Sequence, residues 1–465
     1  MSFRIEKDFL GEKKIPQDVY YGIHTLRAIE NFSVSGYKIE PIFIKALGFV
    51  KKASALTNKE LGYLKDDISG AILQAIDELI ENRHDNQIVV DPLQGGAGTS
   101  TNMNLNEVIA NRALELLGKK KGDYSVISPL KHINMHQSTN DIYPTAMKVA
   151  AIFLLKNLEA EIIEFQSALQ EKEKDFDDVL KVGRTETQDA VPLTLGKTFS
   201  AFSDAIGRDR WRIFKCCERL RVVNLGGTMI GTGIAAPRDY IFMVTDKLRE
   251  ITRLNLSRGE NLIDATQNHD PFVEVSGIIK AHAVNLRKIA SDLRILSSAG
   301  IAEIKLKPLQ AGSSIMPGKV NPVVPEMIEQ CVIKVFANDF IVTESASRGE
   351  LELNAFLPIL NFALLESLSI LTKAVGIFTR KSIKHISVQK ELCRRNVENS
   401  FGFLTALVPL LGYDVVESVA RKAQKTGETP LNIILDSRLA SKSQIDKILT
   451  PENFSKLGFD PPKER

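Results

Sequence analysis

Cysteine is scarce in this sequence of 465 residues, which contains four. Four cysteines in a chain of this length do not form the disulfide framework of a small secreted protein, and no CxxC pair indicates a zinc site. We therefore expect free thiols in a reducing cytoplasm and no metal site. The cysteines are Cys216, Cys217, Cys331 and Cys393.

An excess of charge and a long apolar run are also missing. The net charge is +3, and no run of lysines with interleaved aromatic residues suggests a nucleic-acid partner. The charged N-terminus, MSFRIEKDFLGEKK, lacks the apolar core of a secretory signal. The longest apolar run, Leu353–Leu365, contains asparagine and proline and is too short to span a bilayer. We expect a cytoplasmic globular protein without membrane or nucleic-acid partners.

Proline is absent from four long windows, residues 145–191, 193–236, 272–307 and 359–408. Because proline is poorly tolerated inside helices, these windows can hold long helices. Apolar residues in the first window recur at spacings of four and three, which is the pattern of a helix with one buried face. These residues are Ala151, Leu155, Leu158, Ile162, Phe165 and Leu169. The sequence therefore predicts a mainly α protein with a long central helical bundle.

The distribution of these windows suggests three domains. We expect an N-terminal domain over 1–139, a central helix-bundle domain over 140–391 and a small C-terminal domain over 392–465. Helices with such long apolar stripes carry more apolar surface than one chain can cover, so we also expect oligomerisation through helix packing.

Two polar segments precede predicted helices. QGGAGTSTNMN (94–104) contains glycines that let a backbone approach a ligand, and it places Thr99 near the start of a helix-like run that begins at Asn106. In HQSTNDIYPT (136–145), Ser138 and Asp141 have the spacing of a capping box. Ordinary helix capping is the alternative for both segments, although it leaves Thr139 and Asn140 unexplained.

Two further polar segments are GRTETQDAVPLTLG (183–196) and GSSIMPGKVNP (312–322). In the second, Ser313 and Ser314 follow a glycine, and Lys319 and Asn321 lie near stiffening prolines. We interpret it as a mobile lid, with a plain surface loop as the alternative. Together the four segments offer neutral hydrogen-bonding groups and one cation, which suits a small, polar, anionic substrate.

GSSIMPGKVNP resembles, nearly letter for letter, the signature loop of the aspartase/fumarase superfamily. GGAGTSTNMN, QSTNDIYPT and GRTETQDAVP resemble other shared blocks, and YYGIHTLRAIENF and NPVVPE favour the aspartase branch over the fumarases. The resemblance runs from about Arg4 to the 450s. It implies a three-domain fold whose central bundles form a tetrameric multi-helix core, with each active site shared among three subunits of a homotetramer.

The resemblance also implies an activity. It is the reversible elimination of ammonia from L-aspartate to give fumarate, by a carbon–nitrogen lyase without a cofactor. Ser313 would remove the Cβ proton, giving an aci-carboxylate intermediate. By the family pattern, the α-carboxylate is held by Thr185, Lys319 and Asn321, the amino group by Thr99 and Asn140, and the β-carboxylate by Ser138, Thr139 and Ser314.

One position departs from the fumarase pattern. Glu186 stands where fumarases have a histidine that works with a downstream glutamate, here Glu326. We expect Glu186 to contact the substrate ammonium group, the alternative being that it points into solvent. A fumarate hydratase remains the nearest alternative function. A catalytically inactive structural homologue is the other, although the intact Ser313 and Lys319 argue against it.

Overall fold

The computed structural model describes residues 2–458 of the chain. Its residues divide into two compact units. The first unit comprises Met1–Glu159, Arg212–Ala281 and Ile333–Thr372, and the second comprises Ala160–Trp211, His282–Val332 and Lys373–Arg465. The three predicted domains are consecutive segments of the chain, whereas each of these units combines three separate segments. The predicted domain boundaries therefore stay a prediction.

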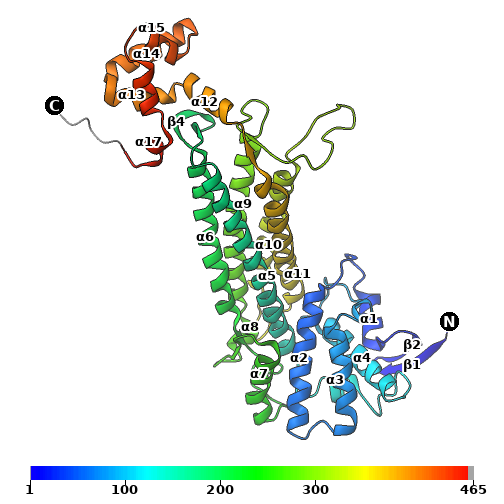
Figure 1. The fold of residues 1–465 in the computed structure, drawn as a ribbon. Helices are drawn as coiled ribbons and strands as arrows, with labels where there is room; N and C mark the ends of the chain where they lie inside the picture. The colour runs from blue at the N-terminus through cyan, green and yellow to red at the C-terminus, as the bar shows by residue number, and fades with distance from the viewer. Residues whose placement is uncertain (1, 459–465) are drawn as a thin grey trace. The chain divides into compact units, whose positions relative to one another are not determined.

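In the first unit, the N-terminal segment combines a hairpin with short helices. β1 (Phe3–Asp8) pairs antiparallel with β2 (Gly11–Pro16), and α1 (Ile23–Asn31), α2 (Pro41–Glu60), α3 (Asp66–Ile80) and α4 (Thr99–Leu116) follow. α2 packs against both α3 and α7 (Arg238–Thr252), as Figure 1 shows. Proline begins α2 and two aspartates lie in the first turn of α3, where each favours a helix start.

Five long helices each contribute residues to both units. They are α5 (Thr139–Asp175), α6 (Leu195–Leu220), α9 (Asp270–Leu296), α10 (Val323–Ala346) and α11 (Leu357–Ile377). All six residues of the apolar stripe predicted for the first proline-free window are fully buried in α5. The predictions of a mainly α protein and of long helices in these windows are confirmed.

Polar pairs that are at least partly buried join the long helices within each unit. In the first unit, Asp339 of α10 accepts hydrogen bonds from Lys280 (2.5 Å) and Ser276 (2.8 Å) of α9. In the second, Asp209 of α6 accepts from Asn285 of α9 at 2.9 Å. Such pairs fix the register between helices that apolar packing alone would leave free to slide.

The helical segment Leu357–His385 is apolar and long enough to cross a bilayer by length and composition, and 61% of the tested window is buried. It extends well beyond the apolar run that the sequence analysis judged too short. Core helices of globular proteins have the same length and composition, and the burial of this one places it in the core.

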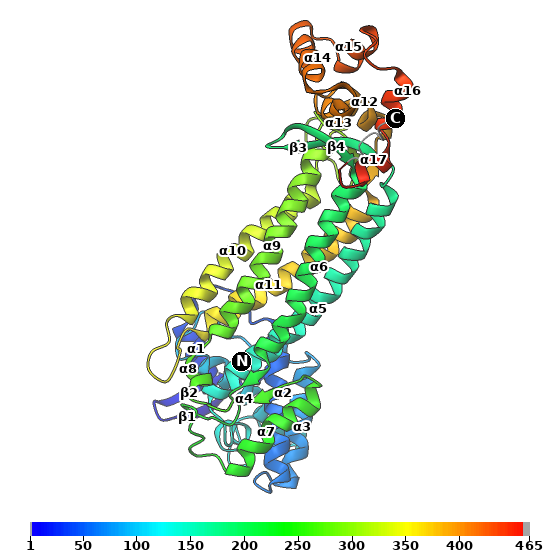
Figure 2. The same cartoon turned by 90° about the vertical axis from the view of Figure 1, so that its left-hand side faces the viewer.

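In the second unit, β3 (Leu180–Thr185) and β4 (Gln188–Thr194) form a hairpin, and a group of short helices forms a separate core beside it (Figure 2). Phe403, Leu407, Ile434 and Ile445 are buried in this core together with Val182 of β3. The helices are α12 (Lys390–Asn399), α13 (Gly402–Leu411), α14 (Tyr413–Thr426), α15 (Pro430–Asp436), α16 (Lys442–Ile448) and α17 (Pro451–Ser455).

The remaining elements are short. β5 (Val222–Val223) pairs parallel with β6 (Ser257–Arg258), and β7 (Ile304–Lys305) pairs antiparallel with β8 (Ser387–Val388). Single turns of helix are η1 (Asp85–Gln87), η2 (Pro129–Ile133), α8 (Asp264–Gln267), η3 (Phe378–Ser382) and η4 (Ile383–His385).

Several long helices expose large apolar side chains. Trp211 of α6 is 62% exposed, Val284 of α9 is 51% exposed, and Ile333 and Phe340 of α10 are 62% and 66% exposed. Trp211 is the single tryptophan of the sequence. Apolar side chains of this size at the surface are typical of helices that pack against another molecule.

Candidate active site

The glycine-rich segment before α4 is shaped by one close contact. Gly98 has a φ of +92°, and a Cβ placed there would lie 2.3 Å from Cδ2 of Tyr143 in α5. Only glycine fits this position, because any side chain would overlap the buried tyrosine ring. α4 then begins at Thr99, seven residues before the run that starts at Asn106 in the sequence prediction.

Thr99 therefore occupies the first turn of α4. Its hydroxyl donates a hydrogen bond to the carbonyl oxygen of Gly96 at 2.8 Å, and its side chain is exposed. Because the single hydroxyl hydrogen is engaged, the lone pairs of Thr99 Oγ1 remain to accept a hydrogen bond from a ligand.

The segment from Ser138 to Asp141 begins α5 with the reciprocal bonds of a capping box. The backbone N–H of Ser138 donates to Asp141 Oδ1 (3.0 Å), and Ser138 Oγ accepts from the N–H of Asn140 (3.2 Å). The predicted cap is thus present, with the hydroxyl bonded one residue earlier than usual. The hydroxyl hydrogen of Ser138 stays available to donate.

Asp141 also ties this segment to a loop that the sequence analysis did not select. Asp141 Oδ2 accepts from the N–H groups of Gly226 and Thr228, each at 3.1 Å. Burial raises the pKa of Asp141 to about 7. The adjacent glycines at 226 and 227 were the available signal for this loop.

Asn140 is held by the same loop. Its Nδ2 donates to the carbonyl oxygen of Met229 (2.8 Å), and Asn224 Nδ2 donates to the carbonyl oxygen of Asn140 (2.9 Å). With one N–H of Nδ2 bonded to Met229, Asn140 Oδ1 is free to accept from a ligand, and the second N–H of Nδ2 also remains.

Thr139, unlike the Asn140 amide, accepts a hydrogen bond from the protein. Its Oγ1 accepts from Nδ2 of Asn102, one turn into α4, at 3.0 Å. This bond joins the N-terminal turns of α4 and α5. In the first unit the structure thus brings together Thr139 and Asn102, and it presents hydroxyl donors at Ser138 and Thr139 and acceptors at Thr99 and Asn140.

The loop 312–322 belongs to the second unit and is closed by its own backbone. The N–H of Gly312 donates to the carbonyl oxygen of Lys319 (2.8 Å), and Asn321 Nδ2 donates to the carbonyl oxygen of Gly312 (2.8 Å). A Cβ at Gly312 would lie 2.7 Å from that Lys319 oxygen, so the closure requires glycine. Lys319 and Ser314 are exposed.

Ser313 is the residue to which this loop directs its free N–H groups. Ser313 Oγ accepts from the N–H groups of Ile315 (3.2 Å) and Met316 (2.9 Å). Two donors aimed at one oxygen favour negative charge on it, since hydrogen bonds to the charged form lower a pKa. The loop therefore places two N–H donors at Ser313 Oγ.

Thr185 ends β3, and Glu186 and Thr187 are the two residues of the β3–β4 turn, with φ of +52° and +64°. All three are exposed. The hairpin is anchored below the turn by Arg184, whose Nη2 lies 2.9 Å from Oε1 of the buried Glu303. This buried pair was missed from the sequence because its members are far apart in the chain.

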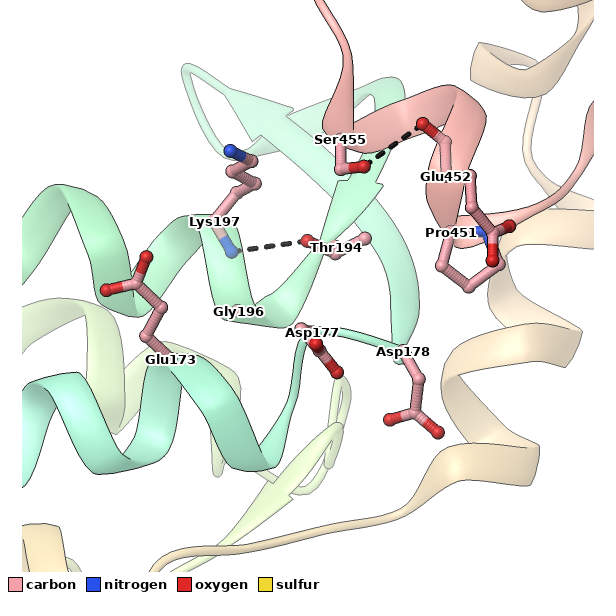
Figure 3. A pocket seen from close by; sticks show the side chains of 9 residues that line it. All are labelled: Glu173, Asp177, Asp178, Thr194, Gly196, Lys197, Pro451, Glu452 and Ser455. Carbon is pink, nitrogen blue, oxygen red and sulfur yellow. Dashed lines mark hydrogen bonds between the residues drawn. The ribbon is translucent and has the colours of Figure 1, made fainter.

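Two cavities lie elsewhere in the described residues. One, of about 300 Å³, is lined by Asp177, Asp178, Lys197 and Glu452 among others (Figure 3). Asp178 also pairs with Lys390 at 2.7 Å. The other, of about 320 Å³, lies beside Tyr37 in the first unit. Neither is lined by a predicted site residue. Within residues 2–458, no group of three or more His, Cys, Asp or Glu side chains could hold a metal ion.

The chain is similar to known lyases over most of its length. A family model described as "Lyase" matches residues 11–337, and one described as "Fumarase C C-terminus" matches residues 403–456. The aspartate ammonia-lyase of a Bacillus species is 46% identical over 98% of each chain. That of Escherichia coli K12 is 44% identical over 97% of this chain and 96% of the relative.

Two solved structures are similar to the fold. One is a fumarate lyase:delta crystallin from Brucella melitensis bound to cobalt, with a TM-score of 0.93 and 42% identity over 98% of this chain and 100% of that one. The other is a class II fumarase from Schistosoma mansoni, with a TM-score of 0.90 and 29% identity over 97% and 98% of the two chains.

Proposed function

Since the chain belongs to the lyase family within the aspartase/fumarase superfamily and is a carbon–nitrogen lyase, we propose that its substrate is L-aspartate. The products are fumarate and ammonia, and the reaction is reversible. The similarity to aspartate ammonia-lyases extends over nearly the whole chain, and it supports L-aspartate over L-malate as the substrate.

The observation that carries the proposal is the polarity of the fixed groups in the first unit. Thr99 and Asn140 offer acceptors, because the Thr99 hydroxyl hydrogen and one N–H of Asn140 Nδ2 are bonded to main-chain carbonyls while Thr99 Oγ1 and Asn140 Oδ1 can still accept. Ser138 and Thr139 offer donors, because each oxygen accepts a hydrogen bond within the protein and keeps its hydroxyl hydrogen for a ligand. An ammonium group needs acceptors and a carboxylate needs donors, and L-aspartate carries both groups.

In the proposed mechanism Ser313 is the base. Its ionised Oγ removes a proton from the carbon beside the β-carboxylate, and the electrons of that C–H bond pass into the carboxylate as an aci-carboxylate dianion. They return to form the C=C bond while the C–N bond breaks and its electron pair leaves with ammonia. The two N–H groups at Ser313 Oγ stabilise the alkoxide that this step requires.

The carboxylates are held by different groups. Lys319, Asn321 and Thr185 bind the α-carboxylate, and one N–H of Asn321 remains for it after the bond to Gly312. Ser314 joins Ser138 and Thr139 around the β-carboxylate, where charge develops. Preorganised donors at such a position are worth roughly 10²–10³ in rate each.

Glu186 is proposed to contact the substrate ammonium group. Its exposure at the tip of a hairpin turn leaves its carboxylate accessible. Glu186→Gln should then raise the Michaelis constant for L-aspartate with a smaller change in kcat. An unchanged Michaelis constant would instead mean that Glu186 points into solvent.

The experiment that tests the function follows the ultraviolet absorbance of fumarate when the protein is given L-aspartate or, in parallel, L-malate. Absorbance that rises with aspartate alone supports the proposal. A rise with malate alone would make the chain a fumarate hydratase. No rise with either would favour the inactive structural homologue.

We further propose a cytoplasmic homotetramer in which each active site takes residues from three subunits. The exposed Trp211, Ile333 and Phe340 supply apolar surface for such an assembly. Light scattering should give four times the 51.6 kDa chain mass. Co-expression of inactive Thr99→Ala and Ser313→Ala chains should restore part of the activity, because mixed assemblies contain sites with neither change. Failure to restore any would argue for sites built from one chain.

A further inference from the structure

A buried lysine begins a chain of hydrogen bonds that ends at Thr139. Lys51 of α2 is 1% exposed, and its Nζ lies 3.1 Å from Asn134 Oδ1 and 2.8 Å from Gln137 Oε1. Burial lowers the pKa of Lys51 to about 7. Charged or neutral, the amine has an N–H for each oxygen, so both side-chain amides turn their oxygens toward it.

The far ends of these two amides agree with that orientation. Asn134 Nδ2 donates to the carbonyl oxygen of Gln137 (3.3 Å), and Gln137 Nε2 donates to the carbonyl oxygens of Ile133 (3.0 Å) and Met135 (3.2 Å). Main-chain carbonyls only accept. Asn134 is thus fixed from both sides, with its oxygen toward Lys51.

Asn134 Oδ1 then dictates the orientation of Asn102. It lies 3.2 Å from Nδ2 of Asn102 and 3.2 Å from Nδ2 of Asn106. If Asn102 were turned over, two amide oxygens would face each other. Asn102 therefore presents its NH₂ group, and the same nitrogen donates to Thr139 Oγ1 at 3.0 Å.

The orientation of the Asn102 and Asn106 amides leaves their oxygens without hydrogen-bond donors in the described part of the chain. The Oδ1 atoms of Asn102 and Asn106 are buried and have no hydrogen-bond partner within residues 2–458. A buried acceptor without a partner is costly, so the arrangement is retained at the expense of two unpaired oxygens. Thr139 Oγ1, in contrast, has its acceptor side occupied, and no acceptor for its hydrogen is present in the same residues.

We propose that Asn102 is a positioning residue that, held by Lys51 through Asn134, fixes Thr139 as a hydrogen-bond donor to the substrate β-carboxylate. The proposal rests on the function proposed above and assigns to Asn102 a role that is separate from substrate contact. A donor that cannot turn round is ready for the charge that builds up on the aci-carboxylate, without reorganisation during the reaction.

The test is Asn102→Asp. A carboxylate only accepts, so the Thr139 hydroxyl would turn to donate to it and would be lost to the substrate. We expect kcat to fall roughly 10²-fold, with a smaller change in KM. The loss should not add to that of Thr139→Val, because both variants remove the same donor.

Asn106→Ala is the matched control. It removes a bond of the same length to the same Asn134 oxygen without touching Thr139, and should lower thermal stability but leave kcat unchanged. Should Asn102→Asp fold poorly, Asn102→Ala provides a second variant, with a kcat loss of roughly 10-fold expected. Equal kcat losses in the Asn102 and Asn106 variants, or additive losses with Thr139→Val, would overturn the proposal.

Calorimetry with succinate, a dicarboxylate that cannot react, separates this proposal from the reaction. Asn102→Asp should weaken succinate binding at least about 10-fold while Asn106→Ala does not. If the wild type forms no fumarate from L-aspartate but this difference holds, the reaction is wrong and the positioning role stands. If the wild type is active and both variants bind succinate alike, the positioning role is wrong.

Discussion

Two predicted site segments are built in opposite ways. Ser138–Asp141 is bonded to three other parts of the first unit, namely α4, Asn224 and the loop 226–229. In the loop 312–322, the hydrogen bonds that the structure describes stay within the loop or reach the start of α10. The first segment cannot move without breaking buried bonds, and the second can move as one piece.

This difference separates two tasks of an active site. Groups that recognise fixed charges benefit from a rigid frame, because a misplaced donor loses much of its value. A base that must meet its substrate after binding benefits from a segment whose bonds travel with it. The two N–H donors of Ser313 come from the loop 312–322 itself and would move with it, while the mobile lid stays a prediction.

The variant with the largest expected effect is Ser313→Ala, which tests the proposed base in the loop 312–322. We expect kcat to fall roughly 10³–10⁴-fold, because the base is gone, while succinate still binds. Fumarate absorbance measures the first effect and calorimetry the second. The control Ser314→Ala should lose less. Residual activity within tenfold of wild type would require another base.

On the rigid side, Asp141→Asn tests the buried carboxyl. Its pKa is raised from 3.8 to about 7, so the stability it contributes is fully present below pH 4 and is lost as pH rises through 7. The loss amounts to at most about 4 kcal/mol. Urea unfolding between pH 4 and 7 should show a smaller decline in the variant than in the wild type, because burial also raises the pKa of Glu107 to about 7 and that carboxyl titrates in both proteins.

Asn224→Ala is the control, since it removes a bond of the same segment without a titrating group. It should lower stability equally at each pH. The pKa of Lys51 is lowered from 10.5 to about 7, so the stability change from that group falls above pH 7 and outside the window. A decline between pH 4 and 7 that is equally steep in the wild type and in Asp141→Asn would contradict the assignment.

Gly98→Ala tests the rigid part of the first unit through the close contact between Gly98 and the Tyr143 ring. The new methyl group would overlap the ring of Tyr143 at 2.3 Å in addition to straining the backbone, and we expect a loss of about 2–3 kcal/mol in unfolding free energy. Gly62→Ala has a φ of +79° and open space, so it isolates backbone strain, about 1 kcal/mol. Equal losses would mean that the ring moves aside.

Gly312→Ala is the counterpart in the loop 312–322. Its methyl group would meet the Lys319 carbonyl and the Asn321 side chain, both of the same loop, so unfolding free energy should change by less than about 1 kcal/mol. Turnover should fall roughly tenfold, because the loop no longer closes with Ser313 in place. A large loss of stability with normal turnover would reverse the comparison.

The β3–β4 turn gives the smallest effect. Glu186 and Thr187 both have positive φ, which is strained for a β-branched residue such as Thr187. Thr187→Gly should raise unfolding free energy by about 0.5 kcal/mol, as the relieved strain slightly exceeds the added chain entropy. Thermal unfolding measures this, and a lowered midpoint would show that the Thr187 hydroxyl bond to Glu186 matters more.

Much of the fold follows from local pattern. The stripe from Ala151 to Leu169 predicted a buried helix face because helix periodicity needs only neighbouring residues, and α5 confirms it. The superfamily motifs extended this to the whole fold, which the solved relatives confirm. The start of α4 was placed too late, because it depends on the contact between Gly98 and Tyr143, which no local pattern shows.

The sequence motifs proposed site residues, but they did not indicate the residues that hold those side chains in place. Short motifs identified Ser138, Thr139 and Ser313, whose catalytic and binding roles stay predictions. Asn102, Lys51 and the loop 226–229 were not selected, because their value lies in bonds to residues distant in sequence. From the sequence alone, a polar residue in a helix that faces solvent cannot be told from one that belongs to a buried hydrogen-bond network.

The exposed indole of Trp211 provides an intrinsic fluorescent probe of the protein surface around it. As the single tryptophan, it accounts for nearly all emission excited at the red edge of protein absorption, and it lies on α6 at 62% exposure. If helices of separate chains pack over this surface, the emission should shift to the blue as concentration rises and be shielded from dissolved quenchers. Assembly of this protein can thus be followed in real time without any label.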